Sequence, residues 1–233
     1  MISQPRYLPA VNYLQRIYNS EYFVVLDTVQ HNKQDFEHRN KVAGDCKPHW
    51  LSLSLDRSQG SRIPIRSVKL QSSECLDVHR ELLHRYYRNS DNYSPDIIDY
   101  LYSSFRDLTL VSVTNTMLIR LFESIGLSYE SKSRIILASS LQIEYRKGPS
   151  YLADICKFIG GNQYVSGPNG RHYIRDEFST ESITLLWHDF IFPEYKRSGL
   201  PFIPWLAAID ILQHCGFEAL RDIISKSITL GTS

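Results

Sequence analysis

The sequence predicts an α/β protein with a mainly parallel central sheet flanked by helices and a helical block in the middle of the chain. Phe23–Leu26 is a short β-branched and aromatic run, typical of a buried strand. Tyr13–Tyr18 precedes it with apolar residues at helical spacing, and a short strand is expected before Gln4. This strand, helix, strand order favours a parallel sheet, because a parallel crossover usually needs a helix.

The middle of the chain, from Glu74 to Gly126, has three stretches with apolar residues at helical spacing. Gly126 follows the last stretch, at a position where glycine commonly ends a helix. The three apolar faces are Leu76, His79, Leu82, Leu83 and Tyr86; Ile97, Ile98, Leu101 and Phe105; and Met117, Leu118, Leu121, Phe122 and Ile125.

The remaining predicted elements alternate between strands and helices, as in layered α/β folds. The further predicted strands are Trp50–Leu55, Ile63–Leu70, Arg134–Leu141, Gln163–Ser166 and Ile183–Trp187. The further predicted helices are Tyr151–Ile159, Leu206–Cys215 and Ala219–Ile224, the last two separated by Gly216.

Length and charge narrow the class of protein. The 233 residues fit one large domain, and no linker divides the chain, so we expect a single domain over residues 1–233. The 26 basic and 25 acidic residues give a net charge of +1. That balance lacks the basic footprint of a nucleic-acid-binding protein, so no nucleic-acid partner is expected.

The cysteines and the N-terminus indicate a cytoplasmic protein. Cys46, Cys75, Cys156 and Cys215 are far apart, with no CxxC pair, so we expect free thiols and no metal site. The first residues lack the basic and apolar regions of a signal peptide. No apolar run approaches the roughly 20 residues that cross a bilayer, so no membrane partner is expected.

Polar residues cluster in a loop directly after the first predicted strand. This loop, Gln4–Pro9, carries the amide of Gln4 and the phenol of Tyr7 between two prolines. In open α/β sheets, ligands bind beyond the carboxyl ends of strands, so both residues are candidate substrate-binding groups. The alternative is a structural turn in which Tyr7 covers the core.

A second polar cluster, Asp27–Asn40, follows the best predicted strand. Lys33 or Arg39 could hold a phosphate or carboxylate, and Asp27 is a candidate base or sugar-hydroxyl ligand. An exposed, charge-rich loop is the alternative. The candidate substrate-binding residues of this segment are Gln30, Lys33, Arg39 and Asn40.

A third cluster follows the predicted strand Gln163–Ser166. Gly167 permits close backbone approach, and exposed amides there could hold an anion. The spacing fits neither a Walker A loop nor a GxGxxG fingerprint, and a structural turn is the alternative. The candidate substrate-binding residues are Ser166, Gly167, Arg171 and Tyr173.

Two further residues are catalytic candidates. His79 lies on the apolar side of its predicted helix, and Cys156 lies on the helix Tyr151–Ile159. A triad of Cys156, His79 and Asp27 can be written, although nothing in the sequence places the three together. A core histidine and an inert buried thiol are the alternatives.

Taken in order, these segments resemble the WbqC-like family of bacterial proteins over nearly the whole chain. Each motif is weak alone, but the ordered set is specific. It consists of Gln4-Pro5-Arg6-Tyr7-Leu8-Pro9, Tyr13, Phe23–Asp27, Val29-Gln30, Lys33, Phe36, Arg39-Asn40, His79, Tyr86, Ile155-Cys156, Tyr164–Gly167, Tyr173, Phe202, Pro204 and Ile209-Asp210. The sequence departs from the family pattern at Ala10, Asn12, His31, His38 and Tyr151, where Trp, Gly, Tyr, Asn and Arg are usual.

The resemblance implies a role in glycan or specialised-metabolite assembly, such as O-antigen synthesis. The expected activity is transfer of an acyl or aminoacyl group to an amino group of an aminosugar-type substrate. An acyl-CoA or carrier-protein thioester is the expected co-substrate, with no tightly bound cofactor. A nucleotide sugar and an acyl carrier protein are the expected partners.

Two alternatives remain open: a non-catalytic binding or scaffold protein of the same pathway, and a Cys156-dependent thioesterase-like or amide-forming enzyme. We expect the Gln4–Pro9 loop and the Asp27–Asn40 segment to face each other across one cleft. Asp27, Arg39, His79 and Ser166 are expected to meet in one pocket at the rim of the sheet.

Overall fold

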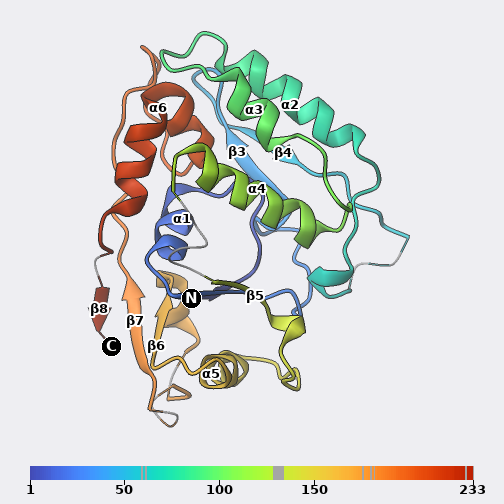
Figure 1. The fold of residues 1–233 in the computed structure, drawn as a ribbon, viewed down its shortest axis with the longest axis vertical. Coiled ribbons are helices and arrows are strands. Elements are labelled where there is room, and N and C mark those ends of the chain that lie inside the picture. Colours follow the sequence, from blue (N-terminus) through green and yellow to red (C-terminus); the bar gives the residue numbers. More distant parts are fainter. Residues whose placement is uncertain are drawn as a thin grey trace.

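A computed structural model of the chain shows an α/β fold built around two small, adjoining sheets (Figure 1). It describes residues 1–58, 60, 62–127, 134–174, 176–178, 180, 182–228 and 230–232. The predicted class, with a mainly parallel sheet and a helical block, is confirmed.

The first sheet is entirely parallel. β2 lies in its centre, with β1 on one side and β5 on the other. Alternate residues of β2 face opposite sides, as in any strand. Phe23 and Val25 join one hydrophobic core, whereas Val24 joins a second core on the other face. The strands are β1 (Ile2–Ser3), β2 (Tyr22–Val25) and β5 (Arg134–Leu137).

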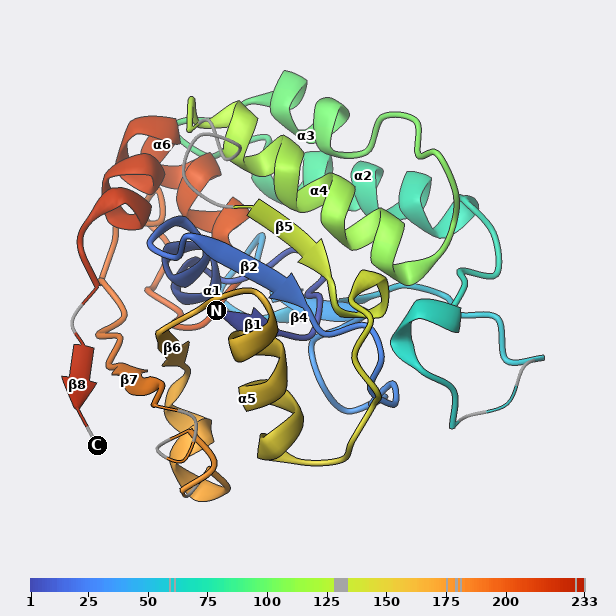
Figure 2. The same ribbon diagram turned by 60° about the horizontal axis from the view of Figure 1, so that its bottom comes forward.

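Helices cover both faces of this sheet (Figure 2). The helical block lies on one face and α5 on the other, so each core is sealed by helices. α1 connects β1 to β2, as the sequence predicts. The helices are α1 (Val11–Tyr18), α2 (Glu74–Tyr87), α3 (Pro95–Leu101), α4 (Leu110–Ser124) and α5 (Pro149–Phe158).

The second sheet adjoins the first at β1. Its strand β6 lies beside β1 and pairs in parallel with β7, which pairs antiparallel with β8. The connection after β1 leads to β2 on one side, and the connection after β6 leads to β7 on the opposite side. The two connections therefore diverge between β1 and β6. The strands are β6 (Gln163–Ser166), β7 (Thr184–His188) and β8 (Leu230–Thr232).

Two predicted elements differ in the structure. The polar segment expected as a loop to Asn40 ends in a strand, because Arg39–Val42 (β3) forms an antiparallel hairpin with His49–Ser52 (β4). The strand expected at Ile63–Leu70 is wrong, since Ile65–Ser67 forms a short 3-10 helix after Pro64. Its ends make only isolated bridges.

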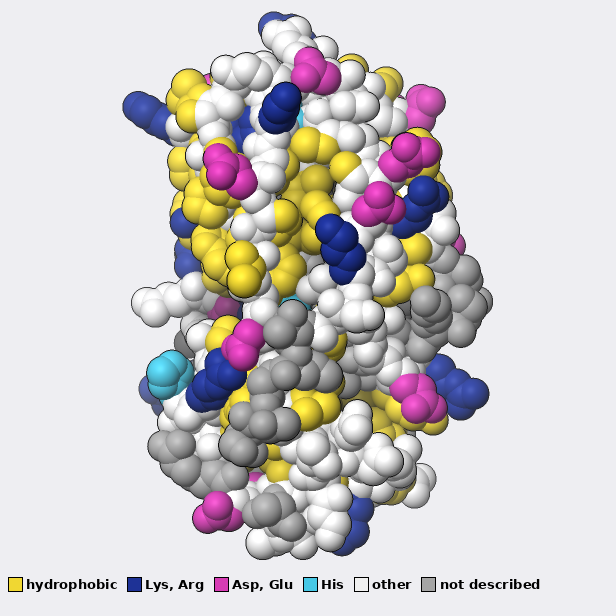
Figure 3. Space-filling model, turned by 90° about the vertical axis from the view of Figure 1, so that its left-hand side faces the viewer, with side chains coloured by type: hydrophobic (Ala, Val, Ile, Leu, Met, Phe, Trp, Pro, Cys, Tyr) yellow, Lys and Arg dark blue, Asp and Glu magenta, His cyan; other side chains and the backbone are white. Residues whose placement is uncertain are grey.

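The last helix, α6 (Ala208–Ser225), follows a long irregular segment, residues 189–207. Gly216 has a φ of 88° inside α6, so the predicted break between two closing helices is confirmed. Aromatic rings of the irregular segment pack on one another, among them Phe192 and Trp205. Hydrophobic side chains gather on the face that carries α6 and this segment (Figure 3).

A buried ion pair ties that irregular segment to the rest of the fold. Arg197 Nε donates to Asp210 Oδ2 at 2.9 Å, and both side chains are fully buried. Arg197 also donates to the carbonyls of Ala43, Asp45 and Pro201. The guanidinium therefore connects α6 to the turn of the β3–β4 hairpin.

Candidate functional site

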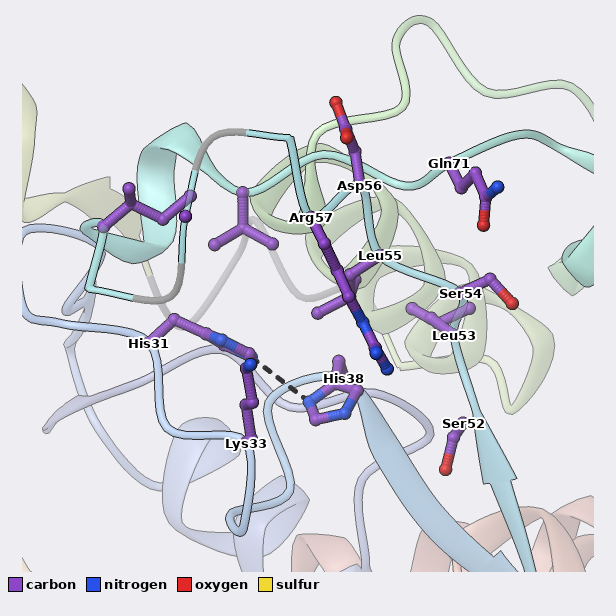
Figure 4. A pocket seen from close by; sticks show the side chains of 13 residues that line it. His31, Lys33, His38, Ser52, Leu53, Ser54, Leu55, Asp56, Arg57 and Gln71 are labelled. Atoms are coloured by element: carbon purple, nitrogen blue, oxygen red, sulfur yellow. Dashed lines mark hydrogen bonds between the residues drawn. The ribbon is translucent and has the colours of Figure 1, made fainter.

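A polar hollow of about 650 Å³ lies between the loop that follows β2 and the strand β4 (Figure 4). That volume is within the usual range for a small-molecule site. The loop contributes His31, Lys33 and His38, and the hollow is completed by Ser52, Leu53, Ser54, Leu55, Asp56, Arg57, Gly60, Ile63, Val68 and Gln71.

Two histidines form the floor of the hollow. His31 Nε2 lies 3.2 Å from His38 Nδ1, as the dashed line in Figure 4 marks. Burial, and to a smaller extent the neighbouring His31, lowers the pKa of His38 to about 4. Burial also lowers the pKa of His31, with a second contribution from Lys33. Both imidazoles are therefore neutral at pH 7. Because one ring donates to the other, the pair keeps one N–H donor and one nitrogen lone pair for a ligand.

Glu37 lies behind the histidine pair and is almost fully buried. Its Oε2 accepts the backbone N–H of Asn32 at 3.0 Å and lies 3.5 Å from His31 Nε2. Burial raises the pKa of Glu37 to about 7. Its other oxygen, Oε1, is enclosed and has no hydrogen-bond partner among the described residues. The Glu37 carboxyl therefore lies next to the histidine pair and has a pKa near neutral pH.

Two cations border the same hollow. Lys33 extends beside His31, and the Arg57 guanidinium points toward His38 (Figure 4). Asp56 lines the hollow but points away from the histidine pair. The cationic groups and the neutral imidazoles suit an anionic, hydrogen-bonding ligand such as a phosphate or carboxylate.

A second hollow of about 530 Å³ continues the first, because the two share Ser52, Ser54 and Gln71. We call the two together the groove. The second part is lined further by residues at the start of α2, and His79 is the imidazole among them. These further lining residues are Ser72, Glu74, Cys75, Val78 and His79.

His79 is held from behind by two tyrosines. The Tyr7 hydroxyl lies 2.7 Å from His79 Nδ1 and 2.5 Å from the Tyr102 hydroxyl. Burial lowers the pKa of His79 to about 4, so this imidazole is also neutral at pH 7. In the tautomer whose Nδ1–H donates to the Tyr7 hydroxyl, Nε2 carries the lone pair and is the ring nitrogen left to meet a ligand. In this tautomer Nε2 can accept a proton from a bound nucleophile.

The other catalytic candidates lie apart from the groove. Asp27 is buried at the end of β2, where its oxygens accept the backbone N–H of Ser139 at 2.9 Å and the Ser139 hydroxyl at 2.6 Å. Asp27 therefore secures the turn after β5, and the structure gives no support to its predicted role as a base.

Cys156 is also unsuited to the predicted triad. The thiol is buried on α5, and its Sγ lies within hydrogen-bonding distance of the carbonyls of Gly161 and Gln163. Burial raises its pKa, which keeps it protonated. Cys156, His79 and Asp27 each hydrogen-bond to different partners, so the structure does not join them in the triad considered above.

The predicted binding residues of the loop after β2 divide into two groups. Lys33 lines the groove. Arg39 instead lies over the Trp50 ring and donates to the carbonyl of Gln34 at 2.7 Å. Asn40 is buried and donates to the carbonyl of Leu8 at 2.6 Å. Gln30 is exposed and bridges to Pro64.

The Gln4–Pro9 loop and the Asp27–Asn40 segment lie side by side, but at their contacts they touch directly and do not face each other across the expected cleft. The Tyr7 N–H donates to the Phe36 carbonyl at 3.1 Å, and Asn40 holds Leu8. They pack directly on each other at these points, and Tyr7 reaches the groove only through His79. The side chain of Gln4 is half-buried, and its carbonyl accepts the Tyr13 hydroxyl at 2.8 Å.

The third predicted cluster lies at the end of β6. Ser166 is buried and donates to the Gly167 carbonyl, while Tyr173 is about half exposed. Arg171 makes two hydrogen bonds to the carboxylate of Asp189, at 2.7 and 3.0 Å. The single pocket of Asp27, Arg39, His79 and Ser166 is therefore wrong, since only His79 of these four lines the groove.

Sequence reasoning missed several groove residues. His31 and His38 lie in a segment that was singled out, and two histidines seven residues apart in a loop were the available signal. Ser52, Arg57 and Gln71 carry no such signal, because only the fold of the chain between β4 and α2 brings them to the loop after β2.

Comparison with known proteins identifies the family. A sequence model of the WbqC-like protein family matches residues 4–222. The chain belongs to this family. It is 25% identical over 224 residues to the uncharacterized protein Rv1507c of Mycobacterium tuberculosis, which covers 94% of this chain and 94% of that protein. No solved structure matches the chain.

The groove contains positions that bear on how this chain differs from the WbqC-like family. His31 and His38, two positions expected from the sequence to depart from the family pattern, line the hollow. Among the described residues, no helix is long and apolar enough to cross a membrane, and no group of three potential ligands could hold a metal ion.

Proposed function

We propose that this WbqC-like protein is an enzyme that transfers an acyl or aminoacyl group to an amino group of a sugar-type substrate. The observation that carries the proposal is the neutral imidazole of His79, held through Nδ1 by Tyr7, in a groove that also holds Lys33 and Arg57. A proton acceptor and an anion-binding region in one groove are what such a transfer needs.

The proposed reaction takes place at the His79 end of the groove. The acceptor amine attacks the thioester carbonyl, an N–C bond forms, the C–S bond breaks and the thiolate leaves. His79 Nε2 takes the proton from the attacking nitrogen and returns it to the thiolate. The nitrogen becomes strongly acidic as its bond to carbon forms, so a base with a lowered pKa can accept that proton.

The cations suit the polar parts of the expected substrates. Lys33 and Arg57 would bind the phosphates of an acyl-CoA, of a carrier protein's phosphopantetheine or of a nucleotide sugar. One of the paired imidazoles, His31 or His38, would accept a hydrogen bond from a sugar hydroxyl or the amine, and the other would donate one. The departure from the family pattern at both positions supports a substrate preference particular to this chain.

A non-catalytic binding protein of the same pathway is the second candidate. The lowered pKa values of His38 and His79 favour it, because a general base works best when its pKa is near the working pH. In such a protein the imidazoles would serve as hydrogen-bond acceptors for a ligand, and nothing would be turned over.

The test combines binding and product formation. The purified chain is screened by thermal shift with acetyl-CoA, aminoacyl-pantetheine thioesters and nucleotide-linked amino sugars, since a ligand of the folded state raises the melting temperature. Each stabilising pair is then incubated with the protein and analysed by mass spectrometry. An acylated amino sugar supports the enzyme, whereas stabilisation without product supports the binding protein. The absence of both contradicts a ligand in the groove.

A further inference from the structure

Two arginines lie close together at the carboxyl ends of β1 and β6, outside the groove. Arg6 is in the loop after β1, and Arg16 is on α1. The Nε atom of each is enclosed and has no hydrogen-bond partner among the described residues. Arg6 lies near enough to Arg16 to lower its pKa, so the two positive charges lie in the same region.

Arg16 is the more unusual of the pair. Among the described residues no carboxylate lies within 4.0 Å of its guanidinium, and no side chain or backbone group accepts a hydrogen bond from it. Burial lowers its pKa, and Arg6 lowers it further. Arg16 is half-buried, and a charge that is partly removed from water without a partner destabilises the folded chain.

Arg6 does not neutralise this charge, and its own counter-charge is weak. Its Nη2 lies 3.9 Å from Asp35 Oδ1, at the limit of an ion pair, and about a third of each side chain is exposed. Its guanidinium lies over the rings of Tyr13 and Phe36. The pair therefore presents two positive charges with one distant carboxylate.

The surroundings of Arg16 are built from hydroxyl-bearing side chains and a glycine. Tyr164 and Tyr173 both lie close enough to Arg16 for its positive charge to lower the pKa of each phenol, against the larger raising effect of burial. The guanidinium lies directly against Gly167, where any side chain would collide with it. The exposed ring of Tyr173 opens this region to solvent.

The position in the fold is one that binds ligands in α/β proteins. β1 and β6 are neighbours, and the chain leaves them in opposite directions. A crevice forms outside the carboxyl ends of two such strands, because their connections diverge. Arg6 and Arg16 come from the connection after β1, and Gly167 comes from the connection after β6.

We propose that Arg6 and Arg16 form a binding site for a phosphate or diphosphate group beside the ends of β1 and β6, where Gly167 leaves room for the Arg16 guanidinium. Two guanidinium forks match the charge and the oxygen geometry of such a group. The site is separate from the groove and stands whether or not His79 is catalytic.

Isothermal titration of the full chain with inorganic phosphate, inorganic pyrophosphate and UDP, at low salt and matched ionic strength, tests the proposal. We expect one pyrophosphate per chain, and roughly ten- to hundredfold weaker binding in Arg16→Gln and Arg6→Gln, because each removes a charge-assisted hydrogen bond. Arg88→Gln, at an exposed arginine elsewhere, should bind as wild type does. UDP binding tighter than pyrophosphate identifies a nucleotide source, and equal binding identifies a free phosphate group.

The stability of the ligand-free variants separates binding from a structural role. Arg16→Met removes an unpaired charge, so we expect the variant without ligand to melt at a higher temperature than wild type. Pyrophosphate should raise the melting temperature of wild type but not that of the variant. Arg16→Lys keeps the charge and loses the fork, and should bind weakly while remaining folded. The proposal is overturned if wild type binds none of the three probes, or if Arg16→Lys and Arg6→Gln bind pyrophosphate as wild type does.

Discussion

The Tyr7 hydroxyl lies 2.7 Å from Nδ1 of His79, although 72 positions separate the two residues in the sequence. The same hydroxyl lies 2.5 Å from that of Tyr102, so the three side chains form one buried chain of hydrogen bonds. This chain orients the groove imidazole from behind. The loop after β1, the helix α2 and the end of α3 each contribute one residue.

Replacing Tyr7 by Phe removes the central hydroxyl of this chain and keeps the ring. We expect Tyr7→Phe to lower the free energy of unfolding by about 1–3 kcal/mol, because His79 and Tyr102 each lose a buried partner. Urea denaturation measures the change. Tyr100→Phe, whose exposed hydroxyl donates to Glu123, is the control and should lose less. Equal losses in the two variants would argue against the buried chain.

We expect substitutions of Arg197 and Asp210 to be strongly coupled in their effects on the free energy of unfolding. Arg197→Met leaves a buried carboxylate without its cation, and we expect a loss of about 3–5 kcal/mol in the free energy of unfolding. Asp210→Asn should be similarly costly. The double variant should lose clearly less than the two single losses added together, because the pair shares one interaction. Additive losses in denaturant titrations would show that the two residues act independently.

Three buried histidines predict acid sensitivity. Burial lowers the pKa values of His38, His79 and His188 to about 4, from 6.5 in the unfolded chain. Between these values the unfolded chain binds protons that the folded chain does not. The free energy of unfolding should therefore fall as the pH is lowered from 6.5 to 4. Denaturation at a series of pH values measures the slope, which His79→Gln should reduce.

The effect of Glu37 on the pH dependence of stability has the opposite sign, so Glu37 provides the control. Its pKa is raised from 4.5 to about 7, so the folded chain binds the extra proton between these values. Its contribution to stability is present at low pH and is lost as the pH rises through 7. Glu37→Gln should therefore make the acid-induced loss steeper. A wild-type protein that gains stability on acidification would contradict the assigned shifts of the three histidines.

The thiols should differ in their reaction with iodoacetamide. Cys46 is exposed, whereas Cys156 is buried and burial raises its pKa. Because the thiolate is the reacting form, we expect Cys46 to be alkylated many times faster than Cys156. Peptide mass spectrometry over a time course measures both rates. Fast alkylation at Cys156 would restore a nucleophilic role for that residue.

Much of the fold follows from local patterns in the sequence. Phe23 and Val25 alternate with Val24 across a strand, and Gly216 interrupts the last helix at a positive φ, so each signal lies within a few residues. The hairpin strand at Arg39–Val42 was missed because its pattern is charged and polar. Its formation depends on pairing with β4, which no local pattern reveals.

The candidate site was predicted only in part, for the same reason. His79 and Lys33 lie in the groove as residue types suggested, but Asp27 and Arg39 are occupied by Ser139 and by Trp50. A polar residue after a strand can form hydrogen bonds with the backbone as readily as with a ligand. Arg16 was missed because a single arginine on an amphipathic helix looks like a solvated residue, and only the packing of Gly167 against it reveals its burial.

The most direct measurement is the turnover of His79→Gln beside wild type, with the donor and acceptor that first give an acylated product. Glutamine keeps a polar side chain but cannot take up the proton. We predict that kcat falls roughly hundredfold or more while the acceptor still raises the melting temperature as in wild type. A His79→Gln protein that turns over at the wild-type rate would contradict the role of His79 as the base.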